Sequence, residues 1–307
     1  YIGVYLWAWL AFMNPHRMTW SFAYDFPFSD FVAAVTLIAV LFSTEKKRIL
    51  MTRETVLLLI FILWMWFTTF FAYYQPQAWS QWEKVWKIQL MVYVTLMLIN
   101  TRQKLDWLVW VIVLSIGIYG VKGGLFTIAN GGSYHVMGPP ESFIAGNNEI
   151  ALAMTMTIPL MRYLQIQAKS TWIRHGLTIA MLLTGIAVIG SQSRGALLGM
   201  SAMGVFLWLK SRKKMFILTA ILVVVFAVST IMPQEWYDRM ATIQTYEQDD
   251  SALGRINAWW MAYNLALHRV TGGGFDTFHK GVFGLYAPEP NDVHDAHSIF
   301  FEVMGEH

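Results

Sequence analysis

Blocks of apolar residues separated by short polar stretches run along the whole chain, and each block holds 12 to 20 residues. A helix needs about 20 apolar residues to cross a bilayer, and fewer where flanking side chains reach the interface. The pattern therefore predicts membrane-spanning helices at Tyr1–Met13, Phe28–Phe42, Thr55–Tyr74, Ile88–Ile99, Trp107–Tyr119, Ile150–Met161, Gly176–Gly190, Ala196–Leu209 and Met215–Met232. A tenth span begins near Ser298.

The composition agrees with an integral membrane protein. Hydrophobic residues make up 56% of the chain and charged residues 13%, whereas soluble domains usually contain about a quarter charged residues. We therefore predict an all-α, polytopic membrane protein with about nine complete transmembrane helices plus the start of a tenth. The absence of cysteine excludes disulfides and thiolate chemistry. Because the chain opens at Tyr1 without a methionine and stops at His307 inside the tenth span, we expect it to be truncated at both ends.

The distribution of lysine and arginine predicts the orientation. If the first span runs outward, the inner loops hold 13 of the 22 Lys and Arg residues within 38 positions. This bias is the one that orients membrane proteins, and it explains the net charge of +3 better than binding to nucleic acid does. The four inner loops are Ser43–Glu54, Asn100–Asp106, Arg162–His175 and Lys210–Lys214.

Two long segments then lie on the outward side, namely Gly120–Glu149 and Pro233–His297. Loops of this length are often functional. The predicted organisation is a transmembrane region over residues 1–232, a large outward loop over 233–297 and the start of a further span over 298–307. Trp79, Trp82 and Trp86 also predict a helix lying in the membrane interface.

The large outward loop contains its own helical pattern. Asp249-Asp250-Ser251 offers capping side chains, and Gly272-Gly273-Gly274 is a terminating signal. Between them, apolar residues recur at helical spacing and predict an amphipathic helix. The stripe consists of Ile256, Trp259, Trp260, Tyr263 and Leu267.

Three polar residues at the outward ends of these helices are the candidate site. Arg194 lies in the tight turn Gly190–Gly195, Arg255 in the first turn of the amphipathic helix, and His297 at the mouth of the last span. Guanidinium groups bind phosphate or carboxylate through paired hydrogen bonds, and histidine is the usual general base near neutral pH. A cation in a first turn is disfavoured by the helix dipole, so the position of Arg255 indicates a role beyond stability.

Each of these residues also has a structural explanation that the sequence leaves open. Arg194 can contact lipid headgroups, and His297 can be a helix-entry residue with a satisfied imidazole. Arg255 can pair with Asp249 or Asp250 on a solvated helix face.

A metal site is a further interpretation. Asp292, His294, Asp295 and His297 lie close together in sequence, and the two histidines at i, i+3 share a face if the segment is helical. The spacing matches no established ligand set, so we predict neither a bound metal nor another cofactor.

Several stretches resemble the O-antigen ligase/polymerase superfamily of bacterial membrane proteins, and most closely the exosortase A-associated O-glycosylation ligases. The superfamily-wide motifs are Ser191-Gln192-Ser193-Arg194-Gly195, Ser251-Ala252-Leu253-Gly254-Arg255-Ile256-Asn257-Ala258-Trp259 and Ala296-His297-Ser298-Ile299-Phe300-Phe301-Glu302. The branch is indicated by Asn14-Pro15-His16-Arg17-Met18-Thr19-Trp20 and by Gly138-Pro139-Pro140-Glu141-Ser142-Phe143-Ile144 with Asn147-Asn148-Glu149.

The resemblance implies an inverting glycosyl transfer on the periplasmic face of the bacterial inner membrane. The donor would be a glycan linked through pyrophosphate to a polyprenyl lipid, and the acceptor a hydroxyl of a glycan, lipid or protein. Arg194 and Arg255 would hold the pyrophosphate, and His297 would accept the proton of the acceptor. Asn148 and Glu149 match the pattern without an assigned role. Membrane lipids are the other expected partner, and nucleic acid is not.

Three other functions compete with this one. A polymerase of the same superfamily, which adds repeat units to a growing glycan, would use the same residues. A transporter of lipid-linked glycans is disfavoured, because the predicted spans carry almost no charge in their interiors. A non-catalytic scaffold would make all three site residues incidental.

Overall fold

The computed structural model of the chain describes residues 1–44, 47, 51–211, 232–241 and 249–307, together with isolated positions between 214 and 230. In this part of the chain the regular structure is helical, with no strand, which confirms the all-α prediction there. The predicted span Met215–Met232 falls largely outside the described residues.

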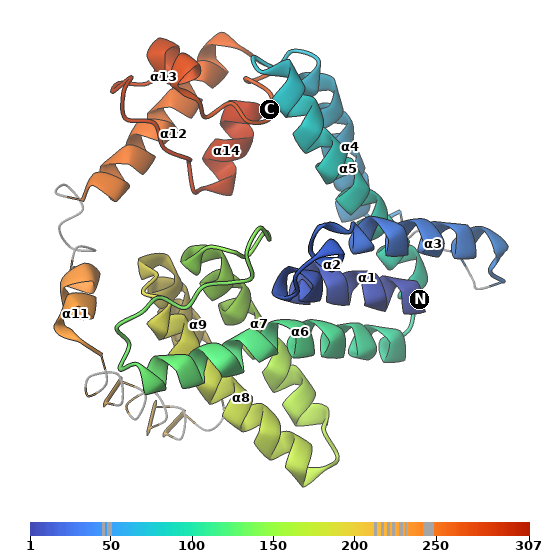
Figure 1. Cartoon of the computed structure of the whole chain (residues 1–307), viewed down its shortest axis with the longest axis vertical. Coiled ribbons are helices and arrows are strands. Elements are labelled where there is room, and N and C mark those ends of the chain that lie inside the picture. Colours follow the sequence, from blue (N-terminus) through green and yellow to red (C-terminus); the bar gives the residue numbers. More distant parts are fainter. Residues whose placement is uncertain are drawn as a thin grey trace. The chain divides into compact units, whose positions relative to one another are not determined.

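Two compact units make up the chain, and each combines two separate stretches of sequence (Figure 1). The first unit comprises Tyr1–Thr44 and Ile99–Ile243, and the second comprises Glu45–Leu98 and Gln244–His307. Arg194 therefore belongs to the first unit, whereas Arg255 and His297 belong to the second.

The first unit is built around three long helices, α6, α7 and α8, of which α6 also packs on α1. Its core includes Ile150 and Met154 on α7 and Val188 on α8. A Cβ at Gly124 of α6 would lie 2.2 Å from the carbonyl oxygen of Leu183, so only glycine allows α6 and α8 to approach this closely. The helices are α1 (Ile2–Met13), η1 (Pro15–Met18), α2 (Phe22–Asp25), α3 (Phe28–Phe42), α6 (Arg102–Ala129), α7 (Asn147–Gln167), α8 (Thr171–Gly190), α9 (Arg194–Lys210) and α11 (Gln234–Ala241).

The second unit joins a helical hairpin to the C-terminal segment of the chain. The end of the first hairpin helix is tied to the segment after α12: Tyr73 N donates to Gly273 O at 2.8 Å, and Arg269 donates to Phe71 O at 2.6 Å. Helices α13 and α14 pack on α12, around a core of Ala258, Met261, Leu265, Val282 and Phe283. The helices of this unit are α4 (Arg53–Thr69), α5 (Gln75–Leu98), α12 (Asp250–His268), α13 (Lys280–Tyr286) and α14 (Ile299–Glu306).

Several predicted boundaries need correction. The predicted interface helix around Trp82 and the span Ile88–Ile99 form one continuous helix, α5. Helix α6 continues ten residues past Tyr119 to Ala129, so the loop predicted to lie outward covers residues 130–146 and begins later than predicted. The glycines in this extension pack against α8, and this tertiary packing overrides their low helix propensity.

Helix α12 confirms the predicted amphipathic helix but buries a different face. Asp249 caps it as predicted, because its side chain accepts from Ala252 N at 2.9 Å. The buried residues are Gly254, Asn257, Ala258, Met261, Ala262 and Leu265, whereas the predicted stripe members Trp260, Tyr263 and Leu267 are exposed. Small side chains on the buried face let the neighbouring segments approach. The helix ends at His268, before the predicted glycine terminator.

Two of the described helices, α6 and α8, are long and apolar enough to cross a membrane, and α1 and α3 are shorter apolar helices. Large apolar side chains such as Phe31, Ile38 and Leu41 of α3 are exposed. Extended apolar surfaces of this kind are rare on soluble proteins and suit contact with lipid. The number of spans and their topology stay a prediction.

Candidate functional site

The turn that carries Arg194 is fixed by the start of α7. Ser193 is the N-cap of α9, and its hydroxyl donates to Asn148 Oδ1 at 2.7 Å. The side chain of Asn147 donates to Ser191 O at 3.0 Å. Asn148, which matched the motif without an assigned role, therefore positions the turn that leads into Arg194.

Arg194 is the first residue of α9 and is half-buried. The N-terminal end of a helix favours anions and disfavours cations, because its free N–H groups carry partial positive charge. The first turn of α9 contains no acidic residue. The backbone N–H groups at the start of α9 and the Arg194 guanidinium thus place positive charge at the same turn, an arrangement suited to an anion.

Helix α11 brings a further cation to this turn, which the sequence reasoning missed. Arg239 Nε donates to Gln192 O at 3.1 Å, and Trp236 Nε1 donates to Ile189 O at 3.2 Å. Desolvation, and secondly the charge of Arg239, lower the pKa of nearby His135. The amphipathic sequence of α11 predicts a helix but gives no signal for its place against the turn.

In the second unit, α12 holds the segment that leads to His297. The Asn257 side chain donates to Glu289 O and to Asp292 O, both at 2.8 Å, and accepts from Glu289 N at 2.9 Å. Trp259 Nε1 donates to Ala296 O at 2.8 Å. Both polar side chains belong to the same motif as Arg255, so this motif positions the loop that carries His297.

Gly254 of the same motif is required by a close packing contact. A Cβ at this position would lie 2.2 Å from Cδ2 of the His294 ring, which rests over the helix backbone. The ring is also fixed by Asp292, whose Oδ1 lies 2.9 Å from His294 Nε2. His294 is thus part of the loop packing against α12.

This use of His294 bears on the metal interpretation. In the part of the chain that the structure describes, no group of three or more His, Asp or Glu side chains is arranged to hold a metal ion. The close spacing of Asp292, His294, Asp295 and His297 in sequence therefore does not become a ligand cluster in space.

His297 is exposed and has an unusual backbone conformation. Its φ is 46°, in the left-handed region that non-glycine residues seldom adopt and that recurs at functional sites. It directly follows buried Ala296 and precedes α14, in which Glu302 interacts electrostatically with the imidazole. The loop thus places the His297 side chain on the surface of this unit.

Arg255 is half-buried, and its Nε is buried without a hydrogen-bond partner among the described residues. A buried N–H group nearly always has an acceptor, and for this one a bound water molecule or a ligand can supply it. Among the described residues no ion pair joins Arg255 to Asp249 or Asp250. The predicted place of Arg255 in a first turn is wrong, however, because α12 starts at Asp250 and Arg255 lies in its second turn. The unfavourable helix dipole acts on Arg194 instead, which is the first residue of α9.

The structure thus places Arg255 and the α12-anchored His297 loop in one unit, and Arg194 in the other unit. Convergence of all three side chains on one ligand stays a prediction.

The Gly254 contact gives the first testable expectation. Gly254→Ala should destabilise the protein by about 1–3 kcal/mol and raise hydrogen exchange over residues 289–297, because the new methyl group displaces the His294 ring. Gly284→Ala is the matched control, since a Cβ on α13 at that position meets nothing within 4 Å. Equal exchange in the two variants would contradict the packing role of Gly254.

Comparison with known proteins agrees with these motifs. Residues 179–307 match the O-antigen ligase family, whose members are membrane proteins, and this range contains Arg194, Arg255 and His297. The match supports the O-antigen ligase superfamily and an O-antigen ligase-like function. Residues 1–169 match a family of unknown function (DUF5935). Because this second match covers more than half of the chain, the chain belongs to that family. No curated protein and no solved structure matches this chain.

Proposed function

We propose that this protein is a glycosyltransferase that moves a glycan from a polyprenyl-pyrophosphate lipid to an acceptor hydroxyl on the periplasmic face of the bacterial inner membrane. The observation that carries the proposal is the buried Nε of Arg255, which has no hydrogen-bond partner among the described residues, on the helix that also holds the His297 loop. Both residues lie within the match to the O-antigen ligase family.

The proposed reaction is a single displacement with inversion at the anomeric carbon. His297 takes the proton from the acceptor hydroxyl as its oxygen attacks the anomeric carbon. The bond between this carbon and the pyrophosphate oxygen breaks, and its electron pair leaves with the lipid pyrophosphate. Arg194 and Arg255 stabilise the charge that develops on this leaving group, where fixed cations lower the barrier most. The proton remains on His297 until solvent removes it.

We also assign the protein to the exosortase A-associated branch, on the motif at residues 14–20 and the motif at residues 138–149. Arg17 Nη1 of the first motif lies 2.7 Å from the Glu141 carboxylate of the second, and the Arg17 guanidinium lies 4.8 Å from the Tyr24 ring centre. The ion pair gives the two stretches a shared structural role. In this branch the acceptor is less settled than the lipid A–core sugar of O-antigen ligases, so the acceptor itself has to be identified by experiment.

A transfer assay in membranes tests the function. Membranes containing the full chain are given a defined polyprenyl-pyrophosphate glycan, and products are identified by mass spectrometry. We expect a single coupled product whose yield is unchanged by a chelator, because no step of the proposed mechanism uses a metal ion. A ladder of products would instead indicate the polymerase, and movement of the donor without a coupled product would indicate a transporter. Loss of transfer with chelator would contradict the metal-independent mechanism.

A further inference from the structure

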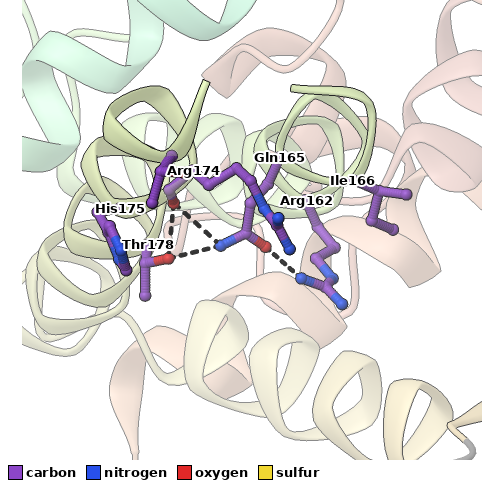
Figure 2. Close-up of a pocket in the computed structure, with 7 residues that line it drawn as sticks. Arg162, Gln165, Ile166, Arg174, His175 and Thr178 are labelled. Atoms are coloured by element: carbon purple, nitrogen blue, oxygen red, sulfur yellow. Dashed lines mark hydrogen bonds between the residues drawn. The ribbon is translucent and has the colours of Figure 1, made fainter. Parts of the chain in front are cut away.

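A basic pocket lies at the end of α8 away from Arg194, where α7 and α8 form a hairpin (Figure 2). Its volume is about 540 Å³. The end of α7 and the start of α8 both contribute to it. The lining residues are Arg162, Gln165, Ile166, Thr171, Arg174, His175 and Thr178.

Gln165 organises the pocket from its base. It is buried, and its Nε2 donates to Thr178 Oγ1 at 2.5 Å and to Arg174 O at 3.3 Å. Its Oε1 accepts from the guanidinium of Arg162 (Figure 2). One buried amide therefore ties both helices together and orients the first of the two arginines.

The charge in this pocket is positive and uncompensated. Two arginines and a histidine line it, and the lining contains no acidic residue. Across the described part of the chain, no carboxylate forms an ion pair with Arg162, Arg174 or His175. Thr171 adds the first turn of a 20-residue helix, whose N-terminus favours an anion. Guanidinium groups in such a setting bind phosphate with paired hydrogen bonds.

Apolar side chains at the same hairpin indicate where that phosphate comes from. Trp172 is 87% exposed and Ile166 68% exposed, and Ile179, two turns further along α8, is also exposed. Tryptophan is enriched at the membrane–water interface, and α8 is one of the two helices long and apolar enough to cross a membrane. A phosphate beside exposed apolar groups is the chemistry of a phospholipid headgroup.

We propose that this pocket binds the phosphate of an anionic phospholipid. By the predicted orientation the hairpin faces the cytoplasmic leaflet, which is rich in such lipids, and basic pockets between helices on that side are suited to them. The site is separate from the proposed glycan transfer and does not depend on it.

Short-chain phosphatidylglycerol is the probe, added to the full chain purified in detergent. Retained lipid is counted by native mass spectrometry, and affinity is measured from the shift in thermal unfolding. Short-chain phosphatidylcholine and inorganic phosphate are the comparison ligands. We expect phosphatidylglycerol to bind and Arg174→Gln to weaken it about tenfold, since a charge-assisted contact is lost. Arg174 is preferred to Arg162 because its guanidinium has no partner among the described residues, so its removal spares the hairpin.

Lys169→Gln is the matched control, because it removes one exposed positive charge between α7 and α8 without touching the pocket lining. It should leave the affinity nearly unchanged. Equal weakening by both variants, or equal affinity for phosphatidylcholine, would overturn the pocket as a headgroup site. Inorganic phosphate binding as tightly as phosphatidylglycerol would overturn the lipid as the ligand.

Discussion

His297→Ala should lower glycan transfer by about 10²- to 10⁴-fold, the usual contribution of a general base, while the protein still folds and inserts. The loop around His297 is held by Asn257 and Trp259, which donate to backbone carbonyls on its way to Ala296. Neither contact uses the imidazole, so its removal leaves the loop anchored. The measurement is the rate of product formation in the membrane assay, normalised to the amount of inserted protein.

A second variant separates chemistry from backbone strain. His297 has a φ of 46°, and asparagine tolerates this left-handed conformation better than alanine does. His297→Asn therefore keeps the backbone and removes the base, and we expect it to be as inactive as His297→Ala. His268→Ala is the control, because this exposed histidine at the end of α12 lies outside the motif. Normal transfer by folded His297→Asn would reject the general-base role.

The sequence predicted the helices well where hydrophobicity alone determines them. Phe28–Phe42 was predicted and is observed with the same bounds, and the capping role of Asp249 is confirmed. The errors occur where tertiary packing determines the end of a helix or the face that it buries. Glycine-rich residues after Tyr119 read as a loop, but contact with α8 makes them helical. Periodicity alone could not show which face of α12 is buried.

For the site, the motifs identified the residues but not their supports. The buried Nε of Arg255 and the hydrogen bond from Ser193 to Asn148 depend on segments far apart in sequence. Arg239 lies in none of the motifs, and it reaches the turn before Arg194 only because α11 packs there. Spacing along the chain carries no information on such contacts, so a three-dimensional arrangement was needed to find them.

These contacts also explain why the motif around Arg255 contains uncharged residues at particular positions. Gly254 makes room for His294, Asn257 binds the backbone of the approaching loop, and Trp259 stacks on Phe301 with ring centres 5.0 Å apart. Arg255 lies among these three positions on α12. The helix therefore fixes an arginine and the segment leading to a histidine with one set of contacts, which is the pre-organisation that charge stabilisation requires.

The arginines give the second large effect. Arg255→Lys and Arg194→Lys should each reduce transfer by about 10- to 100-fold, although the charge is kept, because lysine cannot make the paired contacts of a guanidinium. Arg53→Lys is the control, since it makes the same chemical change at an exposed helix start in the second unit. Wild-type rates in both site variants would reject pyrophosphate binding by these arginines.

The double variant Arg194→Lys/Arg255→Lys then tests whether the two units serve one ligand. Side chains that act independently have losses that multiply, whereas residues sharing a partner show a coupling energy of about 0.5–3 kcal/mol. We expect such coupling, because both guanidinium groups are proposed to hold the same pyrophosphate. The cycle is measured as rates in the membrane assay at saturating acceptor. Strictly multiplicative losses would mean that Arg194 acts elsewhere, and would leave Arg255 and His297 as the site within the second unit.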